Sequence, residues 1–338
     1  MRLRTVDPND DQAFAGWFSV VEASYQHDRP GERNWLLEEL QARGRGSKAE
    51  RFVDVAAIDD GAVVGAARLG LPLLENLRLV GLSQLAVRPD RRRAGIGTAL
   101  LAEVERLATA AGRDLLEADL DEPGWPEVPD PGRIFAGRHG FECAQVAVRR
   151  DLTLPADRER IDTLEVQCRR YVSGYALRTW RDRCPQDLVD DRAVLAARMS
   201  TDAPMGDLER AAEHWDADRV RDREGLQLAQ NRSWVAVGAI HQASGRMVGF
   251  TEVGFPLRAP ERGYQWDTLV RREHRGHRLG AWMKVANLRQ LADVSPVTTL
   301  VTTWNADDNA PMIAVNKSLG CAANGALTHW TKRLGDQR

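Results

Sequence analysis

The sequence has 338 residues, which is more than one compact core usually holds and therefore predicts two domains. Hydrophobic residues make up 43% and charged residues 28%, as is typical of globular proteins in water. Lys and Arg number 47 against 49 Asp and Glu, so the formal net charge is −2. This balance predicts no general attraction to nucleic acid or to an acidic membrane. We therefore expect neither as a partner.

Targeting signals and metal-site spacings are missing from the sequence. The first ten residues are polar and lack the apolar segment of a signal peptide. No stretch reaches the roughly 18 apolar residues of a membrane span. Cys143, Cys168, Cys184 and Cys321 lack the close paired spacing of a zinc site. We expect a cytoplasmic protein that uses no metal and is either a monomer or a homodimer.

The first half of the sequence predicts an α/β domain. A strand at 2–6 precedes helices within 11–43 and a hairpin of strands 52–58 and 63–69. Residues 82–87 predict the next strand, 88–97 a basic, glycine-bearing turn, and the following residues an amphipathic helix. A strand at 115–120 and a short helix ending at Gly140-Phe141 follow.

The boundary between the two domains is predicted near Leu154-Pro155. There the strand-like segment 141–154 ends and a charged stretch, 157–165, begins. We place the N-terminal domain at residues 1–154 and the C-terminal domain at residues 155–338.

The second half shows the same order of elements. A strand at 173–180 and helices at 185–199 and 217–231 precede a hairpin of strands 234–241 and 247–255. Residues 266–270 predict a strand, and 271–280 a basic turn that opens a helix through Leu291. A strand at 299–303 and a short helix at 309–320 complete the series.

The spacing of glycines supports a true repeat. Gly97 and Gly140 are 43 positions apart, and Gly280 and Gly320 are 40 positions apart. The repeat period is about 180 residues, which indicates duplicated domains rather than a solenoid.

The turn after the 82–87 strand has the chemistry of an anion site. The first N–H groups of a helix lack backbone partners, and glycines let phosphates approach them closely. Arginines add charge-assisted hydrogen bonds. The turn carries Arg92, Gly95 and Gly97 in the pattern R-x-x-G-x-G, and it resembles the pyrophosphate loop of the GNAT superfamily. Gly140-Phe141 is similar to the G-F pair that follows the last helix in that family.

The C-terminal turn departs from this pattern in one position. Arg278 stands where the family has its first glycine, although Arg275 and Gly280 match. This variant resembles the C-terminal halves of tandem GNAT proteins of actinobacteria, the group that includes mycothiol synthase. In such proteins the C-terminal half often carries the chemistry. The alternative for both turns is a plain strand–helix connection with a solvated basic face.

The resemblance implies two tandem GNAT domains, each a mixed, mostly antiparallel sheet flanked by helices. It also implies that acetyl-CoA is bound where two parallel strands splay apart. In the N-terminal half the binding residues would be Leu85, Val87, Arg92, Arg93, Ala94, Gly95, Ile96, Gly97 and Thr98. In the C-terminal half they would be Thr268, Val270, Arg275, Gly276, His277, Arg278, Leu279, Gly280 and Ala281.

Catalysis by this family commonly uses a carboxylate base and a Tyr acid four residues before the G-F glycine. That position is Ala136 in the first half and Asn316 in the second. Ala136 cannot donate a proton, whereas Asn316 can form a hydrogen bond to the sulfur or pantetheine without acting as an acid.

The second half carries the better candidates for the base. Glu252 lies among apolar residues of a strand, and Asp267 lies on the strand that leads to the basic turn. A half-buried carboxylate near the thioester suits a general base. The alternatives are an outward-facing or ion-paired Glu252 and an Asp267 with a structural hydrogen bond. The corresponding strand of the first half has Gln84 and no ionisable residue.

These residues predict an acetyl-CoA-dependent N-acetyltransferase that acts on a primary amine of a metabolite or an antibiotic. The tryptophans of the second half are expected mostly in the core, but one or two lining a pocket would favour an apolar or aromatic amine. Two alternatives remain open. The chain could acetylate proteins, or it could be a CoA-binding regulatory or scaffold protein, because neither half has the Tyr.

Overall fold

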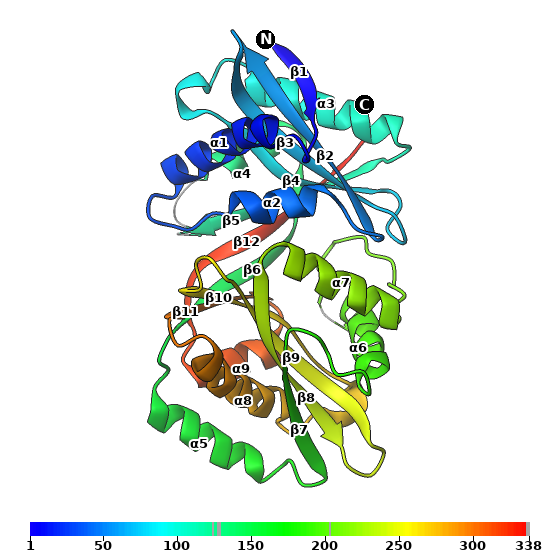
Figure 1. Cartoon of the computed structure of the whole chain (residues 1–338), viewed down its shortest axis with the longest axis vertical. Helices are drawn as coiled ribbons and strands as arrows, with labels where there is room; N and C mark the ends of the chain where they lie inside the picture. The colour runs from blue at the N-terminus through cyan, green and yellow to red at the C-terminus, as the bar shows by residue number, and fades with distance from the viewer. Residues whose placement is uncertain (124, 127–129, 203, 336–338) are drawn as a thin grey trace. The chain divides into compact units, whose positions relative to one another are not determined.

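The computed structural model describes residues 1–123, 125–126, 130–202 and 204–335 (Figure 1). The chain forms two compact units. The first comprises Met1–Pro123, Pro129–Ala144 and Thr328–Arg338, and the second comprises Gly124–Val128 and Gln145–Leu327.

The first unit is built on a mixed sheet. Its strand order is β1-β2-β3-β4-β5-β12. Pairing is antiparallel from β1 to β4 and parallel between β4 and β5. The bounds are β1 Arg2–Val6, β2 Glu50–Asp59, β3 Ala62–Pro72, β4 Leu79–Val87, β5 Leu115–Pro123 and β12 Ala322–Arg333.

Helices cover both faces of this sheet. The helices α1 (Asp11–Asp28) and α2 (Leu37–Gly44) share a core with Ala56, Ala66 and Ala86 on one face. The helix α3 (Ile96–Ala110) packs on alternate strand residues, such as Val55 and Ala67, on the other face, where α4 (Pro131–Arg138) also contributes. Alternate residues of each strand point to opposite faces, so both faces of the inner strands are apolar.

The second unit repeats this plan. Its strand order is β6-β11-β10-β9-β8-β7, with antiparallel pairs except for the parallel pair β10–β11. The bounds are β6 Glu142–Thr153, β7 Tyr175–Arg181, β8 Arg232–His241, β9 Arg246–Pro256, β10 Arg262–Val270 and β11 Leu300–Ala306.

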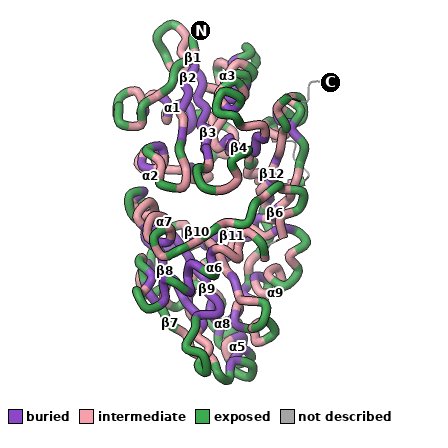
Figure 2. Tube along the Cα trace, turned by 90° about the vertical axis from the view of Figure 1, so that its right-hand side faces the viewer, coloured by how far each residue is buried: buried purple, intermediate pink, exposed green. Residues whose placement is uncertain are grey.

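Its helices also divide between the two faces. The helices α6 (Val189–Asp202) and α7 (Ala217–Ala229) contact the face that carries Trp234 and Phe250. On the other face, α8 (Leu279–Val294) packs against Val237 and Val253. The helices α5 (Arg158–Arg169) and α9 (Ala310–Leu319) pack on α8. Buried residues concentrate along the inner strands of each unit (Figure 2).

Two strands are exchanged between the units. Each comes from one half of the sequence and lies, over part of its length, in the unit that the other half mainly forms. From Gln145 onward β6 lies in the second unit, where it pairs antiparallel with β11. From Thr328 onward β12 lies in the first unit, next to β5. The boundary predicted between residues 154 and 155 separates the two sequence repeats and stays a prediction. The compact units do not follow it, because each contains residues from both sides of it.

The predicted fold class, tandem α/β units with mixed sheets, is confirmed. The strand–turn–helix order is present in both halves, as β4 to α3 and as β10 to α8. The helices expected within 11–43 are α1 and α2, with an irregular segment between them. Most of the charged stretch 157–165, for which no element was predicted, is the start of α5.

Candidate active site

The parallel strands of the first unit separate before they end. The β4–β5 register runs from Leu79 opposite Leu115 to Leu82 opposite Ala118, although the strands continue to Val87 and Pro123. At the same place β4 has an irregularity in its pairing with β3. The ends of β4 and β5 are fully described and show no pairing with each other beyond this point. This part of β4 therefore has backbone groups available on its β5 side.

The second unit shows the same separation. The β10–β11 register ends at Tyr264 opposite Thr302, whereas β10 continues to Val270 and β11 to Ala306. The β10–β9 register shifts between Gln265 and Thr268. Thr268 and Val270, predicted to bind pantetheine, lie in the separated segment of β10, as Leu85 and Val87 lie in that of β4.

The N-terminal turn opens α3 with the geometry that the glycines require. Gly95 adopts a left-handed conformation, φ 80°, as the N-cap of α3. A Cβ atom at Gly97 would lie 3.3 Å from the ring of Phe135, which already makes a tight contact. The turn therefore depends on both glycines, one for its backbone conformation and one for space.

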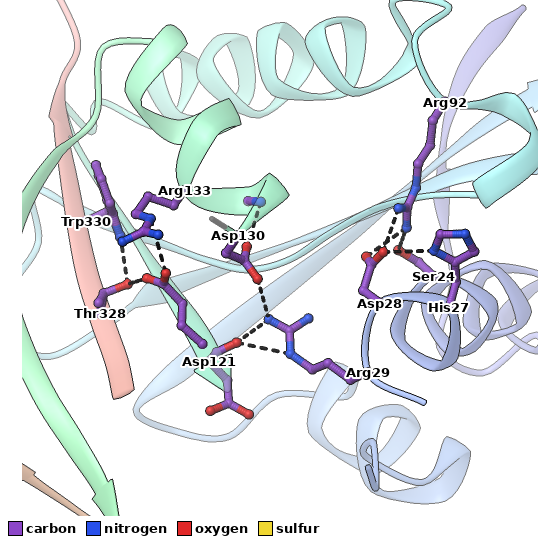
Figure 3. Close-up of polar contacts among 12 residues, drawn as sticks. Ser24, His27, Asp28, Arg29, Arg92, Asp121, Asp130, Arg133, Thr328 and Trp330 are labelled. Atoms are coloured by element: carbon purple, nitrogen blue, oxygen red, sulfur yellow. Dashed lines mark hydrogen bonds and ion pairs between the residues drawn. The ribbon is translucent and has the colours of Figure 1, made fainter. Parts of the chain in front are cut away.

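Arg92 holds this turn against α1. Its Nη1 and Nη2 donate to the two carboxylate oxygens of Asp28 at 2.7 and 2.8 Å, and Nη2 also donates to Ser24 Oγ at 2.9 Å (Figure 3). Its Nε donates to the carbonyl oxygen of Val87 at 3.3 Å. Burial raises the pKa of Asp28, but hydrogen bonds from Arg92 and His27 outweigh it and leave that pKa below its usual value.

Arg93 differs from its neighbours in the turn. It is exposed and adopts φ 66°. Arg91 pairs with Asp59, and Arg88 pairs with Asp90. Within the part of the chain that the structure describes, Arg93 has no hydrogen-bond or ion-pair partner. It is therefore available to an anion at the start of α3.

The C-terminal turn reproduces the anchor of the N-terminal one. Arg275 Nε donates to the carbonyl oxygen of Val270 at 3.0 Å, and its Nη2 donates to Asp202 Oδ2 at 2.9 Å. Gly276 has φ 85° at the place where the first half has Arg93. Two arginines therefore hold equivalent turns with equivalent contacts.

Arg278 occupies the backbone position that Gly95 has in the first half. It is the N-cap of α8 and adopts a left-handed conformation with φ 53°. Its side chain turns toward α5, where the guanidinium lies 5.1 Å from the centre of the Tyr171 ring and Nη1 donates to Gln167 at 3.3 Å. The guanidinium of Arg278 therefore does not cover the backbone N–H groups of the turn.

The histidines of the C-terminal turn join an aromatic cluster. His274 Nδ1 and the hydroxyl of Tyr175 are 2.9 Å apart, and the rings of Tyr175 and His277 are 5.3 Å apart. Burial lowers the pKa of His274, and the neighbouring His241 and Arg271 lower it further.

The two predicted carboxylates lie close to each other and share an arginine. Glu252 is buried on β9, and Arg192 of α6 donates to its two oxygens at 3.1 Å each. Arg223 of α7 donates to Asp267 at 3.1 Å, and its Nη2 lies 3.9 Å from Glu252. The ion-paired alternative for Glu252 is therefore what the structure shows, and the pairing extends to Asp267.

Glu252 and the two arginines, but not Asp267, line a small cavity beneath α6 and α7. The cavity has room of about 20 Å³, enough for one water molecule. Its lining combines charged and aromatic side chains, namely Arg192, Trp215, Val220, Arg223, Glu224, Gln227, Trp234, Glu252 and Trp266. Three tryptophans thus surround the buried carboxylate.

Asn316 lies on the other face of the sheet, on α9. Its Oδ1 accepts a hydrogen bond from Lys284 Nζ at 3.0 Å, and its Nδ2 donates to Asn305 Oδ1 at 2.5 Å. Asn305 belongs to the separated segment of β11. Asn316 is therefore linked to the open end of the parallel pair but lies away from the Glu252 cavity. At its equivalent, Ala136 is buried and apolar.

Comparison with known proteins agrees with this geometry. The model of the acetyltransferase (GNAT) family matches residues 14–123. A solved tandem GNAT protein from the clavulanic acid biosynthesis pathway is 29% identical, over 100% of this chain and 99% of its own, with a TM-score of 0.81. By its fold, the chain is a tandem GNAT protein. Its class is therefore N-acetyltransferase, a family that uses acyl-CoA donors.

A second solved structure supports the fold alone. A GCN5-related N-acetyltransferase from Sphaerobacter thermophilus is 17% identical, over 98% of this chain and 95% of its own, with a TM-score of 0.63. Among curated proteins, no sequence matches the chain.

Sequence reasoning missed several charged residues of this tandem GNAT protein. Arg192 and Arg223 lie on helices and contact residues of β9 and β10 that follow 29 or more positions later in the chain. Lys284 lies among the mostly apolar buried residues of α8. A lysine at a core position of α8 was the one visible signal. The partners of the two arginines had no sequence signal.

The first unit also contains a buried carboxylate that sequence reasoning missed. Glu122 lies on the separated segment of β5, and its Oε1 accepts a hydrogen bond from Thr328 at 2.5 Å. Arg133 lies 3.4 Å from its other oxygen, and Trp330 donates to Thr328 (Figure 3). Burial raises the pKa of Glu122. Its partner is 206 positions away, beyond the reach of local patterns.

In the described ranges, no group of three or more His, Cys, Asp or Glu side chains is placed to hold a metal ion. None of the helices described for this tandem GNAT protein combines the length and apolarity needed to cross a membrane.

Proposed function

We propose that this tandem GNAT protein transfers the acetyl group of acetyl-CoA to a primary amine of a small molecule, a metabolite or an antibiotic. One observation carries the proposal. In each unit two parallel strands separate near their ends. The earlier strand of the pair, β4 or β10, then has unpaired backbone groups on that side and leads into a basic turn at a helix N-terminus. Unpaired strand groups suit the amide groups of pantetheine, and the turn suits its pyrophosphate.

The residues of each turn divide into anchors and ligands. We assign Arg92 and Arg275 to holding the turns, because their guanidinium groups are bonded to Asp28 and Asp202. The N–H groups of residues 94–98 and 276–281, together with exposed Arg93, would contact the phosphates. Leu85, Val87, Thr268 and Val270 would bond pantetheine through their backbones.

The acetyl transfer itself is assigned to the second unit. Glu252 is the proposed base and would take the proton of the amine through one water molecule, for which the adjoining cavity has room. Asp267 shares Arg223 with it and would balance the charge as the proton moves. Asn316 would hold the sulfur end of the donor from the other face of the sheet.

The first unit is proposed as a structural or regulatory CoA site. Its turn keeps both glycines, but Ala136 replaces Asn316, and the position of Glu252 is filled by Arg68, which is fully buried in an ion pair with Asp54. An arginine there cannot accept a proton.

The cavity and the comparison support the proposed substrate class. Trp215, Trp234 and Trp266 line the small cavity beside the proposed base, and aromatic surroundings there would favour an amine with an apolar or aromatic part. The solved protein that matches the full chain comes from the clavulanic acid pathway, and this supports small-molecule chemistry.

Release of free thiol from acetyl-CoA in the presence of a panel of amines tests the proposal. Turnover with small apolar or aromatic primary amines is the expected result. Turnover with peptides alone would favour protein acetylation. Tight CoA binding without turnover by any amine would favour a regulatory protein and overturn the enzymatic assignment.

A further inference from the structure

A buried lysine lies beside the proposed transfer site of the second unit. Lys284 is 3% exposed, and its ammonium group, with three N–H donors, has Asn316 as its one hydrogen-bond partner among the described residues. It follows Gly280 by four positions, as Leu101 follows Gly97 in the first unit. The fold therefore accepts an apolar residue here. Burying a cation instead costs free energy, and this cost points to a role for Lys284.

The contacts of Lys284 lead to the open end of the parallel pair. Asn316 bridges Lys284 on α8 and Asn305 on β11, with hydrogen bonds at 3.0 and 2.5 Å. Asn305 lies in the segment where β11 has separated from β10. The ammonium group is thus two hydrogen bonds from the strand edge that borders the proposed pantetheine site.

Acetyl transfer creates a need for a proton at this place. When the amine attacks the thioester, a C–N bond forms, the C–S bond breaks, and the electron pair leaves on sulfur. The thiolate then requires a proton, and neither Asn316 nor Asn305 can supply one. We propose that Lys284 is the proton donor to the leaving thiolate in the second unit. This inference rests on the proposed function and extends it to a residue without an assigned role.

The protons balance across the sheet. Glu252 takes one proton from the nitrogen of the acceptor on the α6–α7 face, and Lys284 gives one to sulfur on the α8–α9 face. After the products leave, Glu252 releases its proton to solvent and the neutral amine of Lys284 regains one from solvent. The sheet separates acid from base, so the two groups do not neutralise each other directly.

The acidity of Lys284 suits this transfer. Burial lowers its pKa from 10.5 to about 8, and the nearby Cys321 thiol acts in the opposite direction. A free thiol has a pKa of about 8.5, so the donor and the leaving group are closely matched. Proton transfer between matched groups is efficient near neutral pH. Cys321 is itself influenced by Arg150 and Asp151 of β6, which complete the charged surroundings.

Lys284→Met in the full chain is the direct test, with Lys317→Met as the matched control. Lys317 is an exposed lysine next to Asn316 on the same helix. We expect Lys284→Met to lower kcat by about a hundredfold to ten-thousandfold while the KM for acetyl-CoA stays unchanged. We also expect wild-type kcat to fall as pH rises through about 8, and this fall to vanish in Lys284→Met.

A second measurement does not depend on turnover. The sequence contains four lysines, so carbon-13 labelling of lysine allows NMR to follow the pKa of each side chain. The proposal expects one of them near 8, lost in Lys284→Met. Full activity of a folded Lys284→Met variant, or an ordinary lysine pKa at this position, would overturn the proposal. An inactive wild-type protein would instead contradict the proposed function, on which the role of Lys284 rests.

Discussion

Arg68 and Glu252 occupy the same position of the two repeats with opposite charge. Arg68 follows Ala67, which pairs with Leu85, and Glu252 follows Thr251, which pairs with Thr268. Leu85 and Thr268 each lie two positions before the valine that ends the strand. In the first unit Arg68 forms an ion pair with Asp54 of the neighbouring strand β2. In the second unit Glu252 lines a cavity.

Removing Arg68 should destabilise the first unit strongly. Its Nε and Nη2 donate to Asp54 at 2.6 and 2.8 Å, and its Nη1 donates to the carbonyl oxygen of Leu40 at 2.7 Å. Arg68→Met leaves Asp54 buried without its partner, and losing one member of such a pair typically costs about 3–5 kcal/mol. Urea unfolding measures the loss. The double variant Asp54→Asn with Arg68→Met should recover part of it, and a single variant as stable as wild type would refute the ion-pair argument.

Glu252→Gln and Asp267→Asn should reduce turnover in the second unit. Loss of a general base typically lowers the rate by about a hundredfold to ten-thousandfold. Each amide keeps the size of its carboxylate, so acetyl-CoA binding should stay nearly intact. Thiol-release kinetics and calorimetry on the same samples check both statements.

The control for this experiment is Gln84, which lies on the equivalent strand of the first unit. Gln84→Ala should leave turnover unchanged. Full activity of both carboxylate variants, together with loss of activity in folded variants of Gln84 or Arg92, would move the active site to the first unit.

The sequence predicted the local parts of this structure well. Glycines and arginines within one turn specify the strand–turn–helix units, because their requirements are met by residues close in the chain. The exchange of β6 and β12 was not predictable, since a strand shows the same alternation whichever edge it pairs with. The arginine partners of Glu252 were also hidden, because Arg192 lies 60 positions away on a helix whose other buried residues are mostly apolar.

A bulky residue at Gly97 should weaken or block CoA binding to the first unit. Even a Cβ atom there meets Phe135 at 3.3 Å, so a larger side chain must enter the space at the start of α3. For Gly97→Leu we expect an affinity loss of tenfold or more, about 1.4 kcal/mol. Calorimetry on the full chain measures it. The control is Gly137→Leu on α4, where a Cβ atom meets nothing within 4 Å. Unchanged CoA affinity in Gly97→Leu would count against the binding assignment.

Alanine substitutions of Arg93 and Arg92 should affect different properties, CoA affinity in the first case and thermal stability in the second. Arg93→Ala removes an exposed cation, so CoA affinity should fall several-fold at low salt and less at high salt. Arg92→Ala instead removes the bonds to Asp28 and Ser24 and should lower the thermal stability of the first unit. Calorimetry at two salt concentrations and thermal melts separate the two effects. Equal loss of affinity and stability in both variants would contradict the division into anchor and ligand.

Lys284 should make the stability of the second unit depend on pH. Its pKa is about 8 in the folded chain against 10.5 for the ordinary group, because burial disfavours the charged form. The unfolded chain therefore binds more protons between these values, and stability rises with pH across this window. The full cost is present below pH 8 and disappears by about pH 10.5. At about 1.4 kcal/mol per pKa unit, the cost is roughly 3 kcal/mol.

Lys284→Met lacks this titration, so its advantage in the free energy of unfolding at pH 7 should shrink toward zero as the pH rises. Urea unfolding of both proteins at several pH values measures the difference, and Lys317→Met provides the baseline for an exposed lysine. A variant that is less stable than wild type at pH 7 by the same amount at every pH would show that Lys284 is kept for packing. A variant that is more stable but inactive would show that the second unit gives up stability for a proton donor.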